Sequence, residues 1–301
     1  DPSDVLDPLA GLCGRSLVVA DVDGDESRYR LLDTMRVYAR EQLDAGGDGP
    51  ATRDRHLSWC LTMTRESNWS MTGGSHLAWL RRMVRQNDDL LAALGWGLPQ
   101  EGPVVDLRRA RLAIEMTQLL IPYWGETDMG VGQWGWYQLA VEPARRIGDQ
   151  ALLARVFYRA GALDDLALLA DPDWKSDQSD EAPPVLEAGF VAQEHLGRAF
   201  LRGDERLLRL LVDLELVREA GWIVQDAAST LFYRAGDLDG AERLFRLSIE
   251  IKGQAKPVWH WDVAISFGWL GEIYRARHQF SEALAVIDQA LEHFALDQCT
   301  N

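Results

Sequence analysis

Cysteine, lysine and long apolar runs are all scarce in this sequence of 301 residues. Its three cysteines, Cys13, Cys60 and Cys299, lie far apart and form no C-x-x-C pair, which argues against a disulfide framework or a cysteine zinc site. A reducing, cytoplasmic setting is therefore expected. No apolar run approaches the roughly 18 residues that a transmembrane helix needs, so no membrane association is predicted.

Positive charge is also in short supply. The chain has 31 Lys and Arg against 47 Asp and Glu, which gives a formal net charge of -16. Nucleic-acid surfaces need clustered cations, so this chain is not expected to bind nucleic acid directly. The acidic start, Asp1-Pro2, lacks an initiating Met and does not resemble a signal peptide. We interpret the chain as part of a longer polypeptide.

Motifs for catalysis, metal binding and nucleotide binding are missing. The sequence contains no G-x-x-x-x-G-K-[ST], no H-E-x-x-H and no G-x-S-x-G. The segment Gly130–Gly135 fits G-x-G-x-x-G, but the residues before it are typical of a helix end and not of a strand. We interpret these glycines as a turn between helices. No catalytic residue, metal site or cofactor is predicted for this chain.

A β-hairpin followed by a helix is predicted near the start of the chain. Ser16–Ala20 is a short β-prone run, Asp23-Gly24 is a turn dipeptide, and Ser27–Leu31 can return as the second strand. From Leu32 onward the apolar residues recur at helical spacing. The acidic residues between the two strands would repel phosphate.

The rest of the chain has the pattern of an all-helical protein. After a loop at Gly46–Pro50, amphipathic segments of helix length continue to the end, and no other segment has the character of a strand. Asp171–Pro184, rich in Asp, Ser and Pro, is predicted to be a loop.

An internal repeat indicates how these helices are arranged. In residues 264–297, Leu270-Gly271 and Tyr274 match the L-G-x-x-Y pattern of the first helix of a tetratricopeptide (TPR) repeat, and Ala283 and Ala290 occupy its small-residue positions. Four side chains are predicted to fill the space between the two helices: Leu270, Tyr274, Leu284 and Ile287.

A second unit, residues 222–255, precedes this one and turns at Gly236. Five turn positions are treated as equivalent: Gly125, Gly161, Gly203, Gly236 and His278. They predict about five helix pairs over residues 105–301. The predicted fold class is therefore all-α, a TPR-like α-solenoid of helix pairs with a small N-terminal β-hairpin. An irregular helical bundle is the alternative.

The repeat pattern also predicts a concave binding face. First-helix positions that face the groove in TPR proteins, together with tryptophans from two Trp-rich segments, give nine ligand- or partner-binding candidates: Asp226, Thr230, Tyr233, Arg234, Glu272, Arg275, Trp259, Trp261 and Trp124. The alternative is that the tryptophans only pack the core and that the polar residues form a solvated face.

Several segments resemble a family of bacterial regulators. Ser16-Leu17-Val18-Val19 followed by residues 28–39, RYRLLDTMRVYA, resembles the "SLV…RYRLLETVREYA" segment of STAND-type (NB-ARC-like ATPase) transcriptional regulators of the LuxR and antibiotic-regulator type. Arg55-His56 resembles the "RH" that follows, and Trp79-Leu80 with residues 88–96, DDLLAALGW, resembles "WL…DNLRAALAW". Asp33 and Asp89 are mild departures from the pattern.

This resemblance implies a domain organisation. Residues 1–45 would be the C-terminal remnant of a winged-helix domain, residues 46–104 a helical connector, and residues 105–301 the TPR-like repeats. The ATPase domain of the family is missing here, so ATP and Mg²⁺ are expected only in an upstream domain that this chain would contact within one polypeptide.

The resemblance also implies a function. The repeats would form a sensor arm that binds a small-molecule effector or a protein segment in the concave groove and relays this to the ATPase. The alternative is a TPR scaffold for protein–protein interaction, or for self-association, without small-molecule input.

Overall fold

The structure, a computed structural model, describes residues 3–21, 27–66, 74–102, 106–127, 130–174 and 185–299. It divides into two compact units, Asp1–Cys60 and Leu61–Asn301, and the division falls within helix α3 (Gly49–Glu66). The three-part division at residues 45 and 104 stays a prediction.

The first unit contains the predicted hairpin. Its elements are α1 (Ser3–Gly14), β1 (Val18–Asp21), β2 (Arg28–Leu31), α2 (Asp33–Ala45) and the first part of α3. The strands pair antiparallel with Val18 opposite Leu31, and α2 follows directly. The hairpin and its following helix are thus confirmed, whereas the Asp23-Gly24 turn and most of its acidic neighbours lie outside the described residues.

Helices make up the described part of the second unit. They are α4 (Gly74–Arg85), α5 (Asn87–Gly97), α6 (Leu107–Leu119), α7 (Ile121–Glu126), α8 (Gly130–Ile147), α9 (Gln150–Arg159), α10 (Leu163–Ala170), α11 (Val185–Leu201), α12 (Arg206–Asp213), α13 (Val217–Thr230), the π-helical turn η1 (Leu231–Ala235), α14 (Leu238–Gln254), α15 (His260–Ala276) and α16 (Phe280–Cys299). The all-α class with a small N-terminal hairpin is confirmed. Among the helices described, none is both long and apolar enough to cross a bilayer.

Aspartate side chains fix the start of three of these helices. The carboxylate of Asp106 accepts hydrogen bonds from two backbone amides of α6, and Asp149 and Asp237 cap α9 and α14 in the same way. Each cap satisfies amides that have no partner within the helix, which stabilises a helix by about 1 kcal/mol. These caps explain why the helices begin where the sequence turns from Asp to an apolar pattern.

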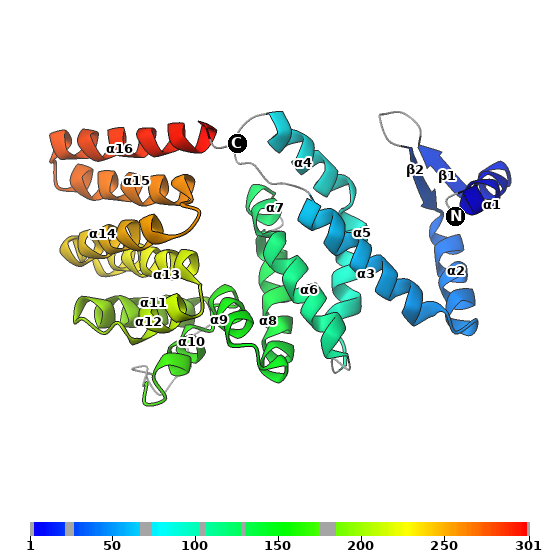
Figure 1. Ribbon diagram of the computed structural model, residues 1–301, viewed down its shortest axis with the longest axis horizontal. Coiled ribbons are helices and arrows are strands. Elements are labelled where there is room, and N and C mark those ends of the chain that lie inside the picture. The colour runs from blue at the N-terminus through cyan, green and yellow to red at the C-terminus, as the bar shows by residue number, and fades with distance from the viewer. Residues whose placement is uncertain are drawn as a thin grey trace. The chain divides into compact units, whose positions relative to one another are not determined.

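The last helices stack as neighbouring pairs (Figure 1). Helix α13 packs along α14, α14 along α15, and α15 along α16. Four of the five predicted turn positions have left-handed backbone: Gly161, Gly203, Gly236 and His278, with φ of 71°, 85°, 65° and 60°. A residue in the left-handed conformation ends a helix, because its backbone N–H turns back to the carbonyl groups of the last helical turn. Only glycine adopts this conformation without steric cost.

Two turn predictions differ from the structure. Gly125 lies within α7, so the first predicted pair does not turn there. Gly130–Gly135 is not a turn between helices, because α8 begins at Gly130 and continues through these residues. The predicted loop at 171–184 is described only as far as Trp174, and its remainder lies outside the described residues.

The packing of the last pair is partly as predicted. Leu270 and Tyr274 are buried, and a Cβ on Gly271 would lie 2.9 Å from Ile287 Cδ1, so glycine allows α16 to approach. The prediction for Leu284 is wrong, because its side chain is 67% exposed. Val286, two residues on and therefore on the opposite face of α16, is buried instead.

Candidate ligand-binding site

A cavity of about 480 Å³ lies among helices α9, α11 and α13 in the second unit. We call it the aromatic cavity, because four aromatic rings line it: Tyr137, Tyr158, Phe190 and Tyr233. Its polar lining includes Arg159, Gln193, Asp226, Thr230 and Arg234. An apolar cavity of this size with a few polar groups is typical of a small-ligand site.

Four of the nine predicted binding residues line this cavity together: Asp226, Thr230, Tyr233 and Arg234. They come from α13 and from η1, which continues it. The cavity is completed by residues of α7 to α11, which the repeat pattern did not predict. The four residues of α13 and η1 therefore form one wall of the aromatic cavity, and the opposite wall comes from other helices.

Asp226 and Tyr158 form the polar centre of the aromatic cavity. The Tyr158 hydroxyl donates a hydrogen bond of 2.7 Å to the Asp226 carboxylate. Burial raises the pKa of Asp226, and the hydrogen bond from Tyr158 partly opposes this shift. Burial and the neighbouring Asp226 charge raise the pKa of Tyr158 well above its usual range. Asp226 is therefore already engaged by a donor inside the protein.

Thr230 and Gln193 connect two walls of the cavity. The Thr230 hydroxyl donates to the Gln193 side-chain oxygen at 2.7 Å, which joins α13 to α11. Thr230 itself is buried. It lines the aromatic cavity, and its hydroxyl already has a protein partner.

Tyr233 and Arg234 lie on a single π-helical turn. Such turns are rare and occur most often at functional sites, because the extra residue redirects the side chains that follow it. Tyr233 is 66% exposed, with its ring edge-on to Trp269 at 5.6 Å between centroids. The Arg234 guanidinium stacks 4.8 Å from the centre of the Phe190 ring.

The other five predicted residues lie elsewhere. Glu272 and Arg275 pair with each other on the exposed side of α15 at 2.6 Å. Arg218 covers the ring of Trp259 at 4.1 Å, and Trp261 packs against Phe294. None of these residues lines the aromatic cavity.

Trp124 is buried, with 3% of its surface exposed. Its ring packs edge-on to Tyr137, which lines the aromatic cavity, so Trp124 supports the wall from behind. For this tryptophan the packing interpretation fits better than direct contact with a ligand.

A second cavity of about 450 Å³ adjoins the first. We call it the arginine cavity, because four arginines line it: Arg111, Arg155, Arg159 and Arg218. Ile121, Tyr158 and Arg159 line both cavities. No sequence pattern indicated this cavity, because its arginines come from three helices far apart in the chain.

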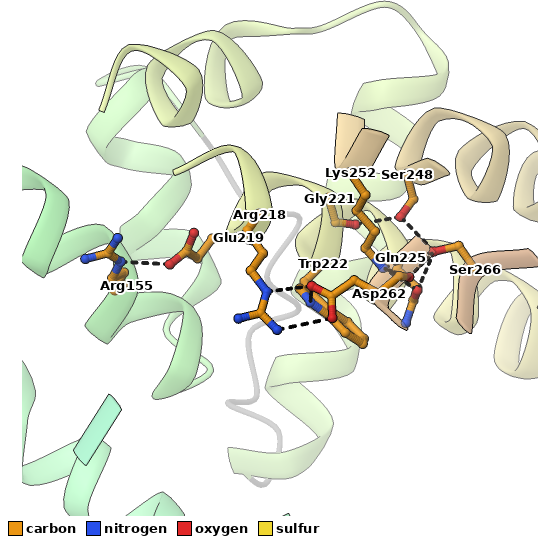
Figure 2. Close-up of polar contacts among 10 residues, drawn as sticks. All are labelled: Arg155, Arg218, Glu219, Gly221, Trp222, Gln225, Ser248, Lys252, Asp262 and Ser266. Atoms are coloured by element: carbon orange, nitrogen blue, oxygen red, sulfur yellow. Dashed lines mark hydrogen bonds and ion pairs between the residues drawn. The ribbon is translucent and has the colours of Figure 1, made fainter. Parts of the chain in front are cut away.

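Three of these four arginines have carboxylate partners. Arg111 pairs with Asp149 at 2.6 Å, and Arg155 pairs with Glu219 at 2.7 Å (Figure 2). The third, Arg218, holds Asp262. Among the described residues, no carboxylate lies within ion-pair distance of Arg159, whose guanidinium stacks 4.8 Å from the centre of the Tyr158 ring.

A buried polar cluster lies beside the arginine cavity (Figure 2). We call it the Lys252 cluster, and it consists of Arg218, Trp222, Gln225, Lys252, Asp262 and Ser266. The Lys252 ammonium donates to Gln225 Oε1 at 2.6 Å, to Ser266 Oγ at 3.0 Å and to the Asp262 carbonyl at 3.2 Å. It also lies 3.9 Å from the centre of the Trp222 ring.

Asp262 is the only carboxylate in the Lys252 cluster. It is 2% exposed, and its side chain accepts hydrogen bonds from Arg218 Nε at 2.5 Å and from Trp222 Nε1 at 3.0 Å. Burial lowers the pKa of Lys252 to about 7, against the opposing charges of Asp262 and Asp226. The cluster joins α13, α14 and α15 through side chains of which Gln225, Lys252, Asp262 and Ser266 are buried, while Arg218 stays partly exposed.

Known proteins with related sequences are transcriptional regulators by name. Over 171 residues, 56% of this chain, the sequence is 31% identical to proteins named "Putative HTH-type transcriptional regulator" from Mycobacterium bovis and from Mycobacterium tuberculosis. The matched segment covers only 18% of the length of those proteins. No protein-family model matches the chain, and no solved structure shows significant similarity to it.

The chain is thus similar, over about half its length, to a small part of HTH-type transcriptional regulators. Within the described residues, no group of three His, Cys, Asp or Glu side chains could hold a metal ion. The candidate ligand-binding site is the aromatic cavity together with the arginine cavity beside it.

Proposed function

We propose that this chain is the sensor arm of a STAND-type transcriptional regulator, with an effector bound in the aromatic cavity. The observation that carries the proposal is that Asp226, Thr230, Tyr233 and Arg234, chosen from a repeat pattern, line one cavity of ligand size. The similarity to HTH-type regulators supplies the regulatory context.

TPR-like repeats are the architecture that best fits the last helices. The pairs α13–α14 and α15–α16 pack as neighbours, and each pair turns at a left-handed residue, Gly236 or His278. Ala241 and Ala290 are buried at the small-residue positions of the second helices. In repeat arrays each pair buries its apolar face only against its neighbours, which leaves a curved surface for binding.

A ligand in the aromatic cavity would contact α9, α11 and α13 together. It can shift the arm between two arrangements only by its difference in affinity for them. We propose that this shift reaches an ATPase domain upstream in the same polypeptide, through residues 1–45 as a winged-helix remnant and residues 46–104 as a connector. ATP and Mg²⁺ would bind in that domain, and this chain would act in the cytoplasm without catalysing a reaction or contacting nucleic acid.

Replacing both Tyr233 and Arg234 by alanine tests this function in the intact regulator. We expect the effector concentration needed for half-maximal response to rise by about tenfold or more, because the double variant removes an aromatic wall and a charged group from the cavity. The measurement is the dose response of a reporter gene under the regulator.

The matched control is the double variant Glu272→Ala with Arg275→Ala. It also removes two large side chains, one of them an arginine, but from the exposed face of α15 outside the cavity. A response that is equally impaired in both double variants, or in neither, would contradict the proposed site.

A scaffold without small-molecule input is the alternative, and one observation favours it. Helix α16 exposes an apolar stripe of Phe280, Leu284 and Leu291, with exposed fractions of 59%, 67% and 58%. Exposed apolar patches of this kind mark protein contacts. If Leu284→Ser with Leu291→Ser abolished self-association measured by light scattering and also abolished regulation, the scaffold function would be the better explanation.

A further inference from the structure

We infer that the aromatic cavity selects a small amphipathic acid, with its apolar body among the aromatic rings and its anionic head on Arg159. The inference rests on the proposed function and adds the chemical class of the effector. It combines three observations: an arginine without a carboxylate partner, the charge distribution around the cavity, and the apolar lining.

Arg159 is the group that would hold the anionic head. It lies at the junction of the two cavities, and no described carboxylate pairs with it. The three other arginines of the arginine cavity each have such a partner, at Asp149, Glu219 or Asp262. A guanidinium offers five N–H donors in a planar fork that fits carboxylate, sulfonate or phosphate oxygens.

The charges of the aromatic cavity favour an anion. Arg159 lines it, and Asp226 is the one carboxylate among the lining residues that the structure describes. Asp226 already accepts a hydrogen bond from Tyr158, so its carboxylate is engaged within the protein and forms no ion pair with Arg159. Burial raises the pKa of Asp226, whereas the Tyr158 hydrogen bond and the nearby charge of Arg159 oppose that shift. An anionic head would supply Arg159 with a charge partner.

A cationic ligand fits the same cavity less well. Aromatic rings beside a carboxylate recognise ammonium groups when the ring faces are open. Here Arg159 stacks on Tyr158 and Arg234 stacks on Phe190, so two cations already occupy faces of the aromatic rings. A further positive charge would be repelled by Arg159.

The volume and lining indicate a small molecule and not a long peptide. About 480 Å³ is within the range of cavities that enclose ligands of drug size. The aromatic rings together with Ile121 and Leu163 provide the apolar wall for the body of the ligand. Oxygen atoms of the head would reach Arg159, with the arginine cavity open behind it.

Two fluorescent probes that differ by one anionic group test the inference on the full 301-residue chain. The anionic probe is 8-anilinonaphthalene-1-sulfonate, and the uncharged probe is N-phenyl-1-naphthylamine, which lacks the sulfonate. All proteins carry Leu284→Ser and Leu291→Ser, so that the stripe on α16 does not bind either probe.

The expected result is a selective loss of affinity. Arg159→Gln should weaken binding of the sulfonate probe by about tenfold or more, because a hydrogen-bonded charge partner is lost. The same variant should change binding of the uncharged probe by less than about twofold, and Arg159→Lys should give an intermediate loss for the sulfonate. Arg202→Gln, an exposed arginine outside both cavities, is the matched control and should change neither.

Two outcomes would overturn the inference. One is equal affinity of the sulfonate probe for the Arg159→Gln and Arg202→Gln chains. The other is an equal loss of both probes with Arg159→Gln. If Tyr233→Ala abolished binding of both probes while Arg159→Gln spared both, the cavity would bind ligands without a preference for anions. In that case the inference would fail and the proposed function would stand.

Discussion

Replacing Asp262 by alanine should lower the free energy of unfolding of the second unit by about 3 kcal/mol. The variant leaves Arg218 and the indole N–H of Trp222 without their acceptor, and removes the carboxylate whose charge favours protonated Lys252. Breaking a buried ion pair typically costs about 3–5 kcal/mol. We expect the lower end, because the Arg218 side chain is 39% exposed and can regain water.

Glu272→Ala is the matched control for this experiment. It removes the carboxylate of an Arg–carboxylate pair on the same helix, α15, but both partners are substantially exposed. Exposed pairs of this kind contribute about 0–1 kcal/mol. Urea unfolding followed by tryptophan fluorescence measures both variants, and hydrogen exchange in α13–α15 reports on the cluster directly. Equal stability of the two variants would show that the Lys252 cluster does not stabilise the fold.

The stability of the chain should rise with pH between about 7 and 9.5 because of Lys252. Burial lowers its pKa from 10.5 to about 7 in the folded protein. Between these values the unfolded chain binds a proton that the folded chain does not, so the free energy of unfolding increases with pH, by at most about 1.4 kcal/mol per pH unit. The gain in unfolding free energy from Lys252 is complete above 10.5, the pKa of this lysine in the unfolded chain, and it is lost as the pH falls to about 7, its pKa in the folded chain.

Lys252→Met tests the assignment, because it keeps an unbranched apolar side chain and removes the titrating group. The rise in urea midpoint from pH 7 to pH 9.5 should be strongly reduced in this variant. It should persist with Lys256→Met, whose lysine is exposed. A slope that is unchanged by Lys252→Met would show that other groups cause it. The upper limit of pH 9.5 keeps tyrosine titration out of the comparison.

Local patterns in the sequence predicted the elements that local chemistry determines. The antiparallel pairing of β1 with β2 follows from two β-prone runs on either side of a turn segment, and the turn at Gly236 follows from a glycine between two amphipathic segments. Leu284 was assigned to the wrong face because α16 is apolar on more than one side, so its composition did not decide which side packs on α15. Tyr233, predicted from the repeat pattern to face a groove, lines the aromatic cavity.

The arginine cavity and the Lys252 cluster could not be predicted in this way. Arg218 and Asp262 are 44 residues apart, and Lys252 meets Gln225 from a different helix. Each of these residues, taken alone, looks like an ordinary charged or polar position on an amphipathic helix. Only the packing of α13, α14 and α15 shows that these side chains meet and that Lys252 and Asp262 are buried where they do.

The Lys252 cluster has a mechanical consequence. The cluster connects α13 to both α14 and α15 by hydrogen bonds, so these three helices should rotate together as one rigid unit. The pivot of this rotation would lie where α13 borders the aromatic cavity. Helices of 17 residues, such as α14 and α15, are about 25 Å long. A rotation of about 5° at this pivot would displace the distant ends of α14 and α15 by about 2 Å. A small adjustment around a bound molecule would then become a displacement large enough to change contacts with a neighbouring domain.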